Sequence, residues 1–302
     1  MSVITTGNHP KILWPGLNSL FGLTYKDVPL QHTEVFDVST SEKAYEEDQE
    51  LPGFGLAPVK SEGGAISYDT HAQGYTTRYS HIVYGLGFIE TEEAVEDNQY
   101  KSRATSRTKA LARSMRVTKE TILANIINRA FDSNYTGGDG KELLATNHPS
   151  LSGDQSNELS VAADLSEASL EDLLIQIMQA TDSRGLRINL MGKKLIVPPQ
   201  LSFEATRIVK STLQNDTANN AVNAMKAMGM LPEGVMVWRY LTDADAWFIK
   251  TDAAEGLKLF NRRALAFEKD GDFDTGNYKH KATERYSGGW SDWRALFGSP
   301  GL

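Results

Sequence analysis

The stretch SEGGAISYDTHAQGYTTRYSHIVYG, residues 61–85, is the feature of this sequence that most limits how the chain can fold. It is rich in Gly, Tyr, Ser and Thr, alternates as a strand does, and holds too few large apolar residues to form a core of its own. The segments EKAYEEDQE (42–50) and LPGFGLAP (51–58) lead into it. Because an isolated two-stranded ribbon is marginal in water, this arm needs a neighbouring surface, either elsewhere in the chain or on another subunit.

Both ends of the arm are expected to continue into other structure. The sequence GYTTRYSHIVYGLGFIE (74–90) becomes steadily more apolar, which predicts a strand that begins exposed and ends inside a core. At the N-terminus, residues 1–35 carry Pro10, Pro15, Gly16, Gly22 and Pro29 between short apolar clusters. That pattern predicts an extended N-terminal arm with one short helical piece.

The strongest single element is a helix predicted over about residues 98–132. Apolar residues recur there at steps of three, four or their sums, and glycines at 137 and 138 lie beyond its end. At about 1.5 Å per residue the helix would be roughly 50 Å long, well above the usual length in globular domains. The residues that mark its apolar face are Tyr100, Ala104, Leu111, Met115, Ile122, Ile126 and Ala130.

The polar face of this helix is strongly basic, although the chain as a whole is acidic, with 39 Asp and Glu against 31 Lys and Arg. One interpretation is a solvated helix face. The other is that the basic residues meet acidic loops of neighbouring subunits, such as residues 46–50, or lie near a polyanion. The basic residues before the first acid, Glu120, are Lys101, Arg103, Arg107, Lys109, Arg113, Arg116 and Lys119.

A region of different character, residues 150–253, is predicted to form a compact α/β unit. SEASLEDLLIQIMQATD begins with Ser166 and Ser169 as candidates for a helix cap. KKLIVPP is a short buried strand, and two further helices are expected at 200–214 and 219–230. GVMVWRYL and DAWFIKT are expected to pair with each other around a turn at 242–245.

The tail, residues 254–302, is rich in strands and has a turn at DGDFDTG, but it could not form an independent core. We therefore expect its strands to return to the strand at 75–90 and to the long helix. The predicted fold class is α+β. The expected division is an arm at 1–35, a first domain built from 36–149 and 254–302, and a central domain at 150–253.

Composition excludes several classes of function. The absence of cysteine removes disulfides, thiolate nucleophiles and cysteine-based zinc sites. The net charge of −8 gives no global attraction to nucleic acid. No apolar run approaches the roughly 20 residues that span a bilayer, and the N-terminus lacks a signal-peptide pattern.

Motifs of catalysis or cofactor binding are incomplete. GGDGKE (137–142) lacks the spacing of a phosphate loop, and GLGFIE (85–90) has Glu90 where a dinucleotide fingerprint needs glycine. DGDFDTG resembles the start of a calcium loop but has Lys281 where a bidentate Glu is needed, which favours a hairpin turn. The six histidines are dispersed. We predict no enzymatic activity, no metal and no cofactor.

The order of parts resembles the major capsid proteins of tailed phages, which share the Hong Kong 97-type fold. LWPGLNSLFGLTY looks like the N-terminal arm of that family, residues 51–100 resemble its E-loop and return strand, and residues 110–153 resemble its spine helix and the loop that follows. This resemblance assigns about 43–85 to the E-loop, about 98–132 to the spine helix, and the two domains to the P-domain and A-domain.

The resemblance implies a function in assembly. Hexamers and pentamers of the chain would form an icosahedral head around double-stranded DNA, with the E-loop of one copy lying on an adjacent copy. Contacts to DNA would be nonspecific, and the other implied partners are scaffolding, portal and possibly decoration proteins, with no membrane. The virion is the implied location, after assembly in the host bacterial cytoplasm. The E-loop residues expected between subunits are Glu46, Glu47, Phe54, Lys60, Tyr68 and Tyr75.

Two further expectations follow from the family. Some relatives join subunits covalently through an E-loop lysine and an asparagine, for which Lys43 or Lys60 and Asn277 are the candidates here. Because the chain opens directly into its arm without a long charged helical extension, we expect a separate scaffolding protein.

Two alternatives remain at this point. An encapsulin-like nanocompartment shell has the same fold but holds cargo enzymes instead of DNA. An α/β enzyme with a scattered site would predict a small oligomer and a concave pocket with perturbed titrating groups, but it leaves the long arm unexplained.

Overall fold

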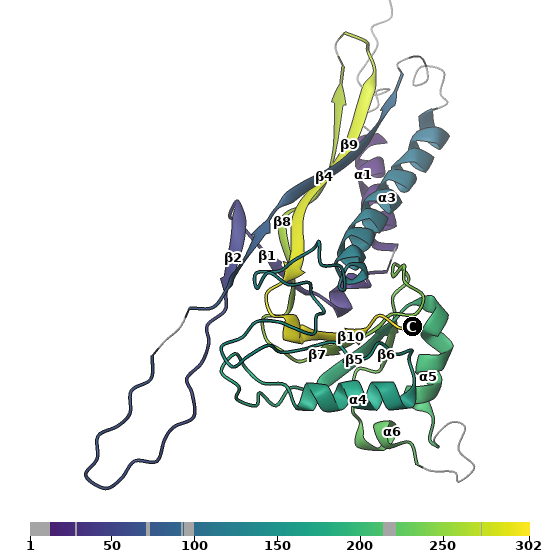
Figure 1. Cartoon of the computed structure of the whole chain (residues 1–302). Helices are drawn as coiled ribbons and strands as arrows, with labels where there is room; N and C mark the ends of the chain where they lie inside the picture. The colour runs from purple at the N-terminus through teal and green to yellow at the C-terminus, as the bar shows by residue number, and fades with distance from the viewer. Residues whose placement is uncertain are drawn as a thin grey trace, which may run out of the picture.

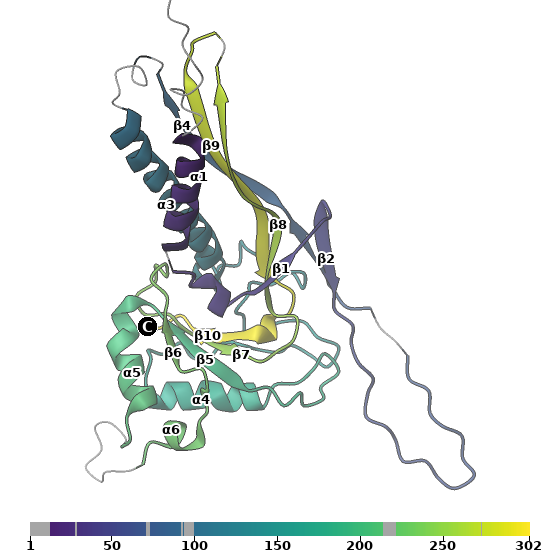
Figure 2. The ribbon, with the colours of Figure 1, turned by 180° about the vertical axis from the view of Figure 1, so that it is seen from behind.

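An elongated upper unit, a smaller lower unit and a long projecting loop make up the molecule (Figures 1 and 2). The structure, a computed structural model, describes residues 13–27, 29–70, 73–91, 93, 100–213, 222–272 and 274–302. The upper unit is a long twisted sheet with helices along one side, and the lower unit is a short sheet covered by helices (Figure 1). The loop leaves from the point where the two units meet.

The upper sheet has the strand order β1-β8-β9-β4. β4 and β9 pair antiparallel over nine residues, so the 75–90 strand and the tail do lie together as the sequence predicts. β8 and β9 form a long antiparallel hairpin, and β1 lies parallel to β8 at the other edge. The bounds are β1 Asp37–Thr40, β4 Ile82–Glu90, β8 Leu257–Gly271 and β9 Tyr278–Trp290.

DGDFDTG forms the turn of this hairpin. The amide of Asp272 donates to the carbonyl of Asn277, and the amide of Gly276 donates back to the carbonyl of Asp272. Gly276 has a φ of 68°, a left-handed conformation that glycine adopts without strain.

Two helices cover one side of the upper sheet (Figure 2). α3 (Tyr100–Asn128) is the predicted long helix, which ends four residues before the expected 132. α1 (Leu13–Asp27) packs along it and is the helical piece expected in the N-terminal arm. Leu111 and Met115 of α3 are buried with Phe21 of α1, so the predicted apolar face is the packed one.

The lower unit contains a four-stranded sheet of order β10-β7-β5-β6 and three helices. Its strands are β5 Gly192–Val197, β6 Val235–Val237, β7 Trp247–Thr251 and β10 Leu296–Ser299. Its helices are α4 Glu167–Met178, capped by Ser166 as predicted, α5 Ser202–Lys210 and the single turn α6 Ala224–Met228. Short 3-10 turns lie at His32–Glu34, Pro199–Leu201 and Trp293–Ala295.

One predicted pairing in this unit is wrong. β6 and β7 do not pair with each other, because β5 lies between them, parallel to β6 and antiparallel to β7. β5 is almost fully buried, so a central place in the sheet satisfies its backbone on both sides.

The last strand also differs from expectation. β10 pairs with β7 in the lower sheet and does not return to the upper one. Phe297 is buried there among the residues of the lower core. The tail therefore contributes to both units, which ties them together covalently.

Buried side chains form one core at the junction and one inside the lower unit. The junction core joins the C-terminal part of α3 to both sheets through residues such as Leu123, Trp238 and Phe248. The lower core surrounds Trp247 and Leu173. The junction core leaves little freedom between the units, so it provides a firm base for the projecting loop.

Candidate assembly interface

The projecting loop is the expected arm, and its root is a short ribbon. β2 (Tyr45–Gln49) pairs antiparallel with β3 (Thr76–Ser80), and the pairing extends as far as Glu50 and Gly74. In the described part of the loop from 51 to 70, the one backbone-to-backbone hydrogen bond is a turn, from Gly64 N to Ser61 O. Most backbone groups of the loop therefore face solvent in the isolated chain (Figure 1).

The side chains of this loop include several large apolar residues that are mostly exposed. Val59 is fully exposed and Tyr68 is 92% exposed. A concentration of such side chains on a segment without a core of its own is typical of an interaction surface. The exposed apolar residues of the loop are Leu51, Phe54, Leu56, Val59, Ile66 and Tyr68.

The acidic residues of β2 have partners within the chain. Glu47 pairs with Arg78 of β3, with 2.6 Å between Oε1 and Nη2. Glu46 accepts a hydrogen bond from Ser41 and pairs with Lys43 at 3.0 Å. The two carboxylates therefore lie at the root of the arm, where they stabilise its own ribbon.

Two aromatic residues of the return segment attach the ribbon to the rest of the chain. Tyr79 is buried, packs edge-on against Phe260 with 5.0 Å between ring centroids, and makes a hydrogen bond to Ser291. Tyr75 is half-buried, and burial followed by nearby carboxylates raises the pKa of its hydroxyl. Of the predicted contact residues, Tyr75 thus lies against its own chain, whereas Phe54, Lys60 and Tyr68 are exposed.

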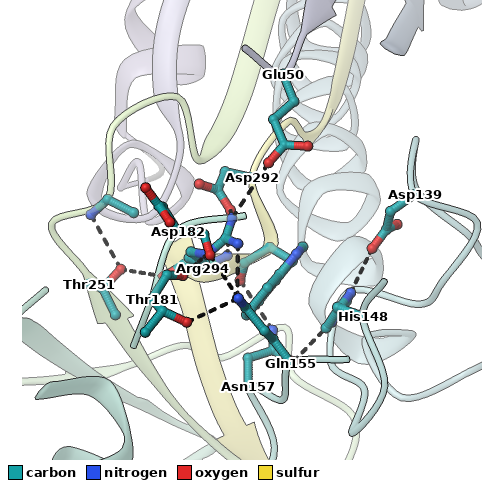
Figure 3. Close-up of polar contacts among 12 residues, drawn as sticks. Glu50, Asp139, His148, Gln155, Asn157, Thr181, Asp182, Thr251, Asp292 and Arg294 are labelled. Atoms are coloured by element: carbon teal, nitrogen blue, oxygen red, sulfur yellow. Dashed lines mark hydrogen bonds and ion pairs between the residues drawn. The ribbon is translucent and has the colours of Figure 1, made fainter. Parts of the chain in front are cut away.

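Arg294 joins the root of the arm to the lower unit (Figure 3). Its guanidinium donates to the carbonyl of Thr181 and to Gln155 Oε1, each at 2.9 Å, and pairs with Asp292 at 3.2 Å. Glu50, the residue after β2, lies 3.9 Å from the same guanidinium. Burial raises the pKa of Glu50, while Arg294 opposes that shift.

A second buried network surrounds His148 in the loop after α3 (Figure 3). Nδ1 of His148 lies 2.6 Å from Asp139, Nε2 lies 3.0 Å from Asn157 Oδ1, and the ring stacks on Trp293 with 4.3 Å between centroids. Asn157 donates to the carbonyls of Leu143, Trp293 and Leu296. His148 therefore has a structural part in fixing the loop that follows α3.

The basic residues of α3 divide into two groups. Lys109 and Arg113 are exposed, and Arg107 is half-exposed with its guanidinium 3.8 Å from Glu90 at the end of β4. Arg116 differs from the expectation of a basic outer face, because it is buried with its guanidinium over the ring of Tyr25, 4.5 Å from the centroid. The side chains of Lys101 and Arg103 lie outside the described residues.

Features of an enzyme site are weak in the described part of the chain. GGDGKE forms a turn in which Gly140 N donates to Gly137 O. A hollow of about 330 Å³ beside α3 and β4 is lined largely by aromatic and aliphatic side chains. Among the described residues no group of three or more His, Asp or Glu could hold a metal ion, and no helix is long and apolar enough to cross a membrane.

The fold matches solved structures of shell-forming subunits. The virus-like particle from Pyrococcus furiosus is 11% identical, covers 95% of this chain and 99% of that chain, and gives a TM-score of 0.55. The capsid of an empty GTA particle is 12% identical, with coverages of 89% and 88% and a TM-score of 0.56. The subunit of Mycobacterium phage Adephagia is 10% identical, with coverages of 98% and 94% and a TM-score of 0.54.

These likenesses define the Hong Kong 97-type capsid fold that the sequence predicts. The sequence model of a family described as phage capsid protein matches residues 74–298, so the chain belongs to that family. A comparison with curated proteins finds no similar sequence. The chain is a major capsid protein that self-assembles into icosahedral shells, and its location is the virion capsid. The nanocompartment alternative, which shares the fold, gains no better support from these matches.

Proposed function

We propose that this capsid protein assembles through hexamers and pentamers into a head that encloses double-stranded DNA, and that residues 51–70 of each copy lie on an adjacent copy. The observation that carries the proposal is the projecting loop, in which apolar side chains and most backbone groups have no covering surface within the described chain. Contacts that repeat head to tail close into rings, which suits such an arm.

The exposed face of α3 supports a lining for packaged nucleic acid. Lys109 and Arg113 are exposed on it, and the one acid of the helix, Glu120, is buried and accepts hydrogen bonds from His32 and its neighbour. Nonspecific contact with phosphate needs only such cations and weakens with salt. The chain's net charge of −8 keeps this contact weak.

The remaining partners follow from the family. Scaffolding and portal proteins, and possibly a decoration protein, would join the shell during assembly in the cytoplasm of the host bacterium. Covalent links from Lys43 or Lys60 to Asn277 of a neighbour stay a prediction. Lys60 is exposed in the loop and Lys43 pairs with Glu46, while the Asn277 carbonyl is part of the β8–β9 turn.

Sedimentation with negative-stain electron microscopy of the purified chain, co-expressed with candidate scaffolding proteins, tests the proposal. Shells, or rings near 200 kDa from six copies of 33.3 kDa, are expected. Changing Leu56, Val59, Ile66 and Tyr68 together to Ser should abolish rings and shells while the folded chain persists. The matched control changes Glu62 of the same loop to Gln and should assemble. Shells that form normally from the serine variant would refute the role of the loop.

A further inference from the structure

The loop has a second attachment to its own chain, well beyond the β2–β3 ribbon. The guanidinium of Arg184, in the lower unit, donates to both carboxylate oxygens of Asp69 at 3.2 and 3.1 Å and to the carbonyl of Thr70. Asp69 Oδ2 also accepts a hydrogen bond from the amide of Gly55 at 2.8 Å. One carboxylate therefore joins the outgoing segment, the return segment and the lower unit.

The turn that presents Arg184 is itself rigid. Asp182 Oδ1 accepts hydrogen bonds from the amides of Arg184 and Leu186, each at 2.8 Å, and the Asp182 amide donates to the Leu186 carbonyl. The side chain of Gln155 accepts a hydrogen bond from Arg294 and donates one to the carbonyl of Asp182 at 2.8 Å (Figure 3). The position of Arg184 is thus set by the same network that holds the root of the arm.

The ion pair between Arg184 and Asp69 is partly exposed. The side chain of Arg184 is 17% exposed and that of Asp69 is 39% exposed, and a single ion pair at such exposure contributes little to global stability. Residues 51–70, however, make no backbone-to-backbone hydrogen bond to the described part of the body. A modest local interaction can therefore decide the direction of a long segment, although it hardly changes the stability of the chain.

We propose that the contacts of Arg184 with Asp69 and Thr70, together with the Asp69–Gly55 hydrogen bond, form a clamp that sets the direction of the arm before subunits meet. The clamp pre-organises the exposed residues from Leu56 to Tyr68 for a second copy of this chain. Pre-organisation lowers the entropic cost of association. Arg184 and Asp69 are positioning residues, and their part in assembly rests on the proposed function of the loop.

The carboxylate of Asp69 stays ionised in the clamp. Hydrogen bonds from the amides of Gly55 and Thr70, and then the charge of Arg184, lower its pKa. Within residues 51–70 the other ionisable side chains are Lys60, Glu62 and Tyr68, all exposed and outside these contacts. The clamp should therefore hold at neutral pH and open only in acid.

A distance measurement on the unassembled chain tests the clamp directly. Because the sequence has no cysteine, spin labels can be placed at Glu62→Cys in the loop and Asp172→Cys on α4 without further changes. Pulsed electron paramagnetic resonance should give a narrow distance distribution in the parent and a broad one after Arg184→Ala or Asp69→Ala. Arg187→Ala is the control. Arg187 is a cation in the same region, but it donates to the carbonyl of Gln179 and not to the loop, so its removal should leave the distribution narrow.

Assembly provides the second readout. The protein concentration needed for half-maximal shell formation should rise about threefold to tenfold in Arg184→Ala, with parent behaviour in Arg187→Ala. The second variant, Asp69→Ala, leaves the lower unit unchanged, so it guards against misfolding of Arg184→Ala and should give the same broadening. A distribution that stays narrow in both variants overturns the clamp. Broadening without any change in assembly overturns its part in assembly. Failure of the proposed function is seen separately, as normal shells from the serine variant of the loop.

Discussion

Lys119 of α3 and Glu284 of β9 form an ion pair inside the upper unit, with 3.5 Å between Nζ and Oε2. The side chains are 10% and 2% exposed. The ammonium group also donates to Asn261 Oδ1 at 2.9 Å and lies over the ring of Tyr286. Burial lowers the pKa of Lys119 and raises that of Glu284, while each charge opposes the shift of the other. The attraction between the two charges and the contacts of Lys119 with Asn261 and Tyr286 therefore offset the desolvation cost of burying both groups.

Removing one member of this pair should be costly, because it leaves the other charge buried without its counter-ion. We expect Lys119→Met to lower the free energy of unfolding by about 3–5 kcal/mol. The double variant Lys119→Met with Glu284→Leu should recover part of that loss, since the carboxylate that lost Lys119 is then gone, while the buried Arg116 loses a nearby opposite charge. Urea unfolding of the unassembled chain measures both. Equal losses in the single and double variants would show that packing, not charge, holds this place.

Sequence patterns were sufficient for the elements whose signals are local. The apolar periodicity of α3 predicts its packed face, because Leu111 and Met115 recur at helical spacing. The stretch from Ser61 to Gly85 holds too few large apolar residues to form a core, which predicts that the loop needs another surface. Both features depend on neighbours in sequence, which a single chain displays directly.

Contacts between distant residues could not be predicted in the same way. Nothing local distinguishes Arg116, which packs on Tyr25, from the exposed Arg113 three positions earlier. The pairing of β5 between β6 and β7 depends on competition among strands for one central place. For the clamp, Arg184 and Asp69 lie 115 residues apart, and no local pattern links them.

Because His280 of β9 is buried, we expect the free energy of unfolding to fall in mild acid. It is 1% exposed, stacks on Phe88 with 4.7 Å between centroids, and lies 3.8 Å from Glu90. Burial, followed by the charge of Lys269, lowers its pKa to about 4. Because the unfolded chain has a histidine pKa near 6.5, the unfolded state binds more protons between pH 6.5 and 4. Stability from this group is complete above pH 6.5 and falls as the pH drops toward 4.

The expected loss over that range is about 3 kcal/mol for this group alone. Buried acids such as Glu90 and Glu284 have raised pKa values and act in the opposite direction, since the folded state then binds the extra protons. The measurement is therefore a difference, namely denaturant unfolding of the parent minus that of His280→Leu at each pH. A difference that does not change between pH 7 and pH 4 would exclude His280 as the titrating group.

Replacing Asn157 should lower the free energy of unfolding much more than replacing an ordinary polar side chain. Its amide donates to three backbone carbonyls, and its oxygen accepts from Ala145 N at 2.9 Å and from His148. Asn157→Ala leaves several buried polar groups without partners, each of which costs about 1–3 kcal/mol. We expect a loss of about 4 kcal/mol or more and a largely insoluble chain. The exposed Asn134→Ala is the control and should change the free energy of unfolding by less than about 0.5 kcal/mol.

Phe21 predicts how firmly α1 is attached to the upper unit. Its ring stacks on Phe267 of β8, with 4.6 Å between centroids and 1° between planes, and only 3% of the residue is exposed. Truncating a buried phenylalanine costs about 3–5 kcal/mol. We expect this loss to exceed the stabilisation that the remaining contacts of α1 provide. Phe21→Ala should therefore release α1 while the sheet stays folded. Hydrogen exchange should become at least tenfold faster in residues 18–27 and stay slow in α3.

Leu23→Ala, on the exposed side of the same helix at 65% exposure, should leave exchange unchanged. Slow exchange in α1 of Phe21→Ala would mean that contacts other than this ring stack hold the helix.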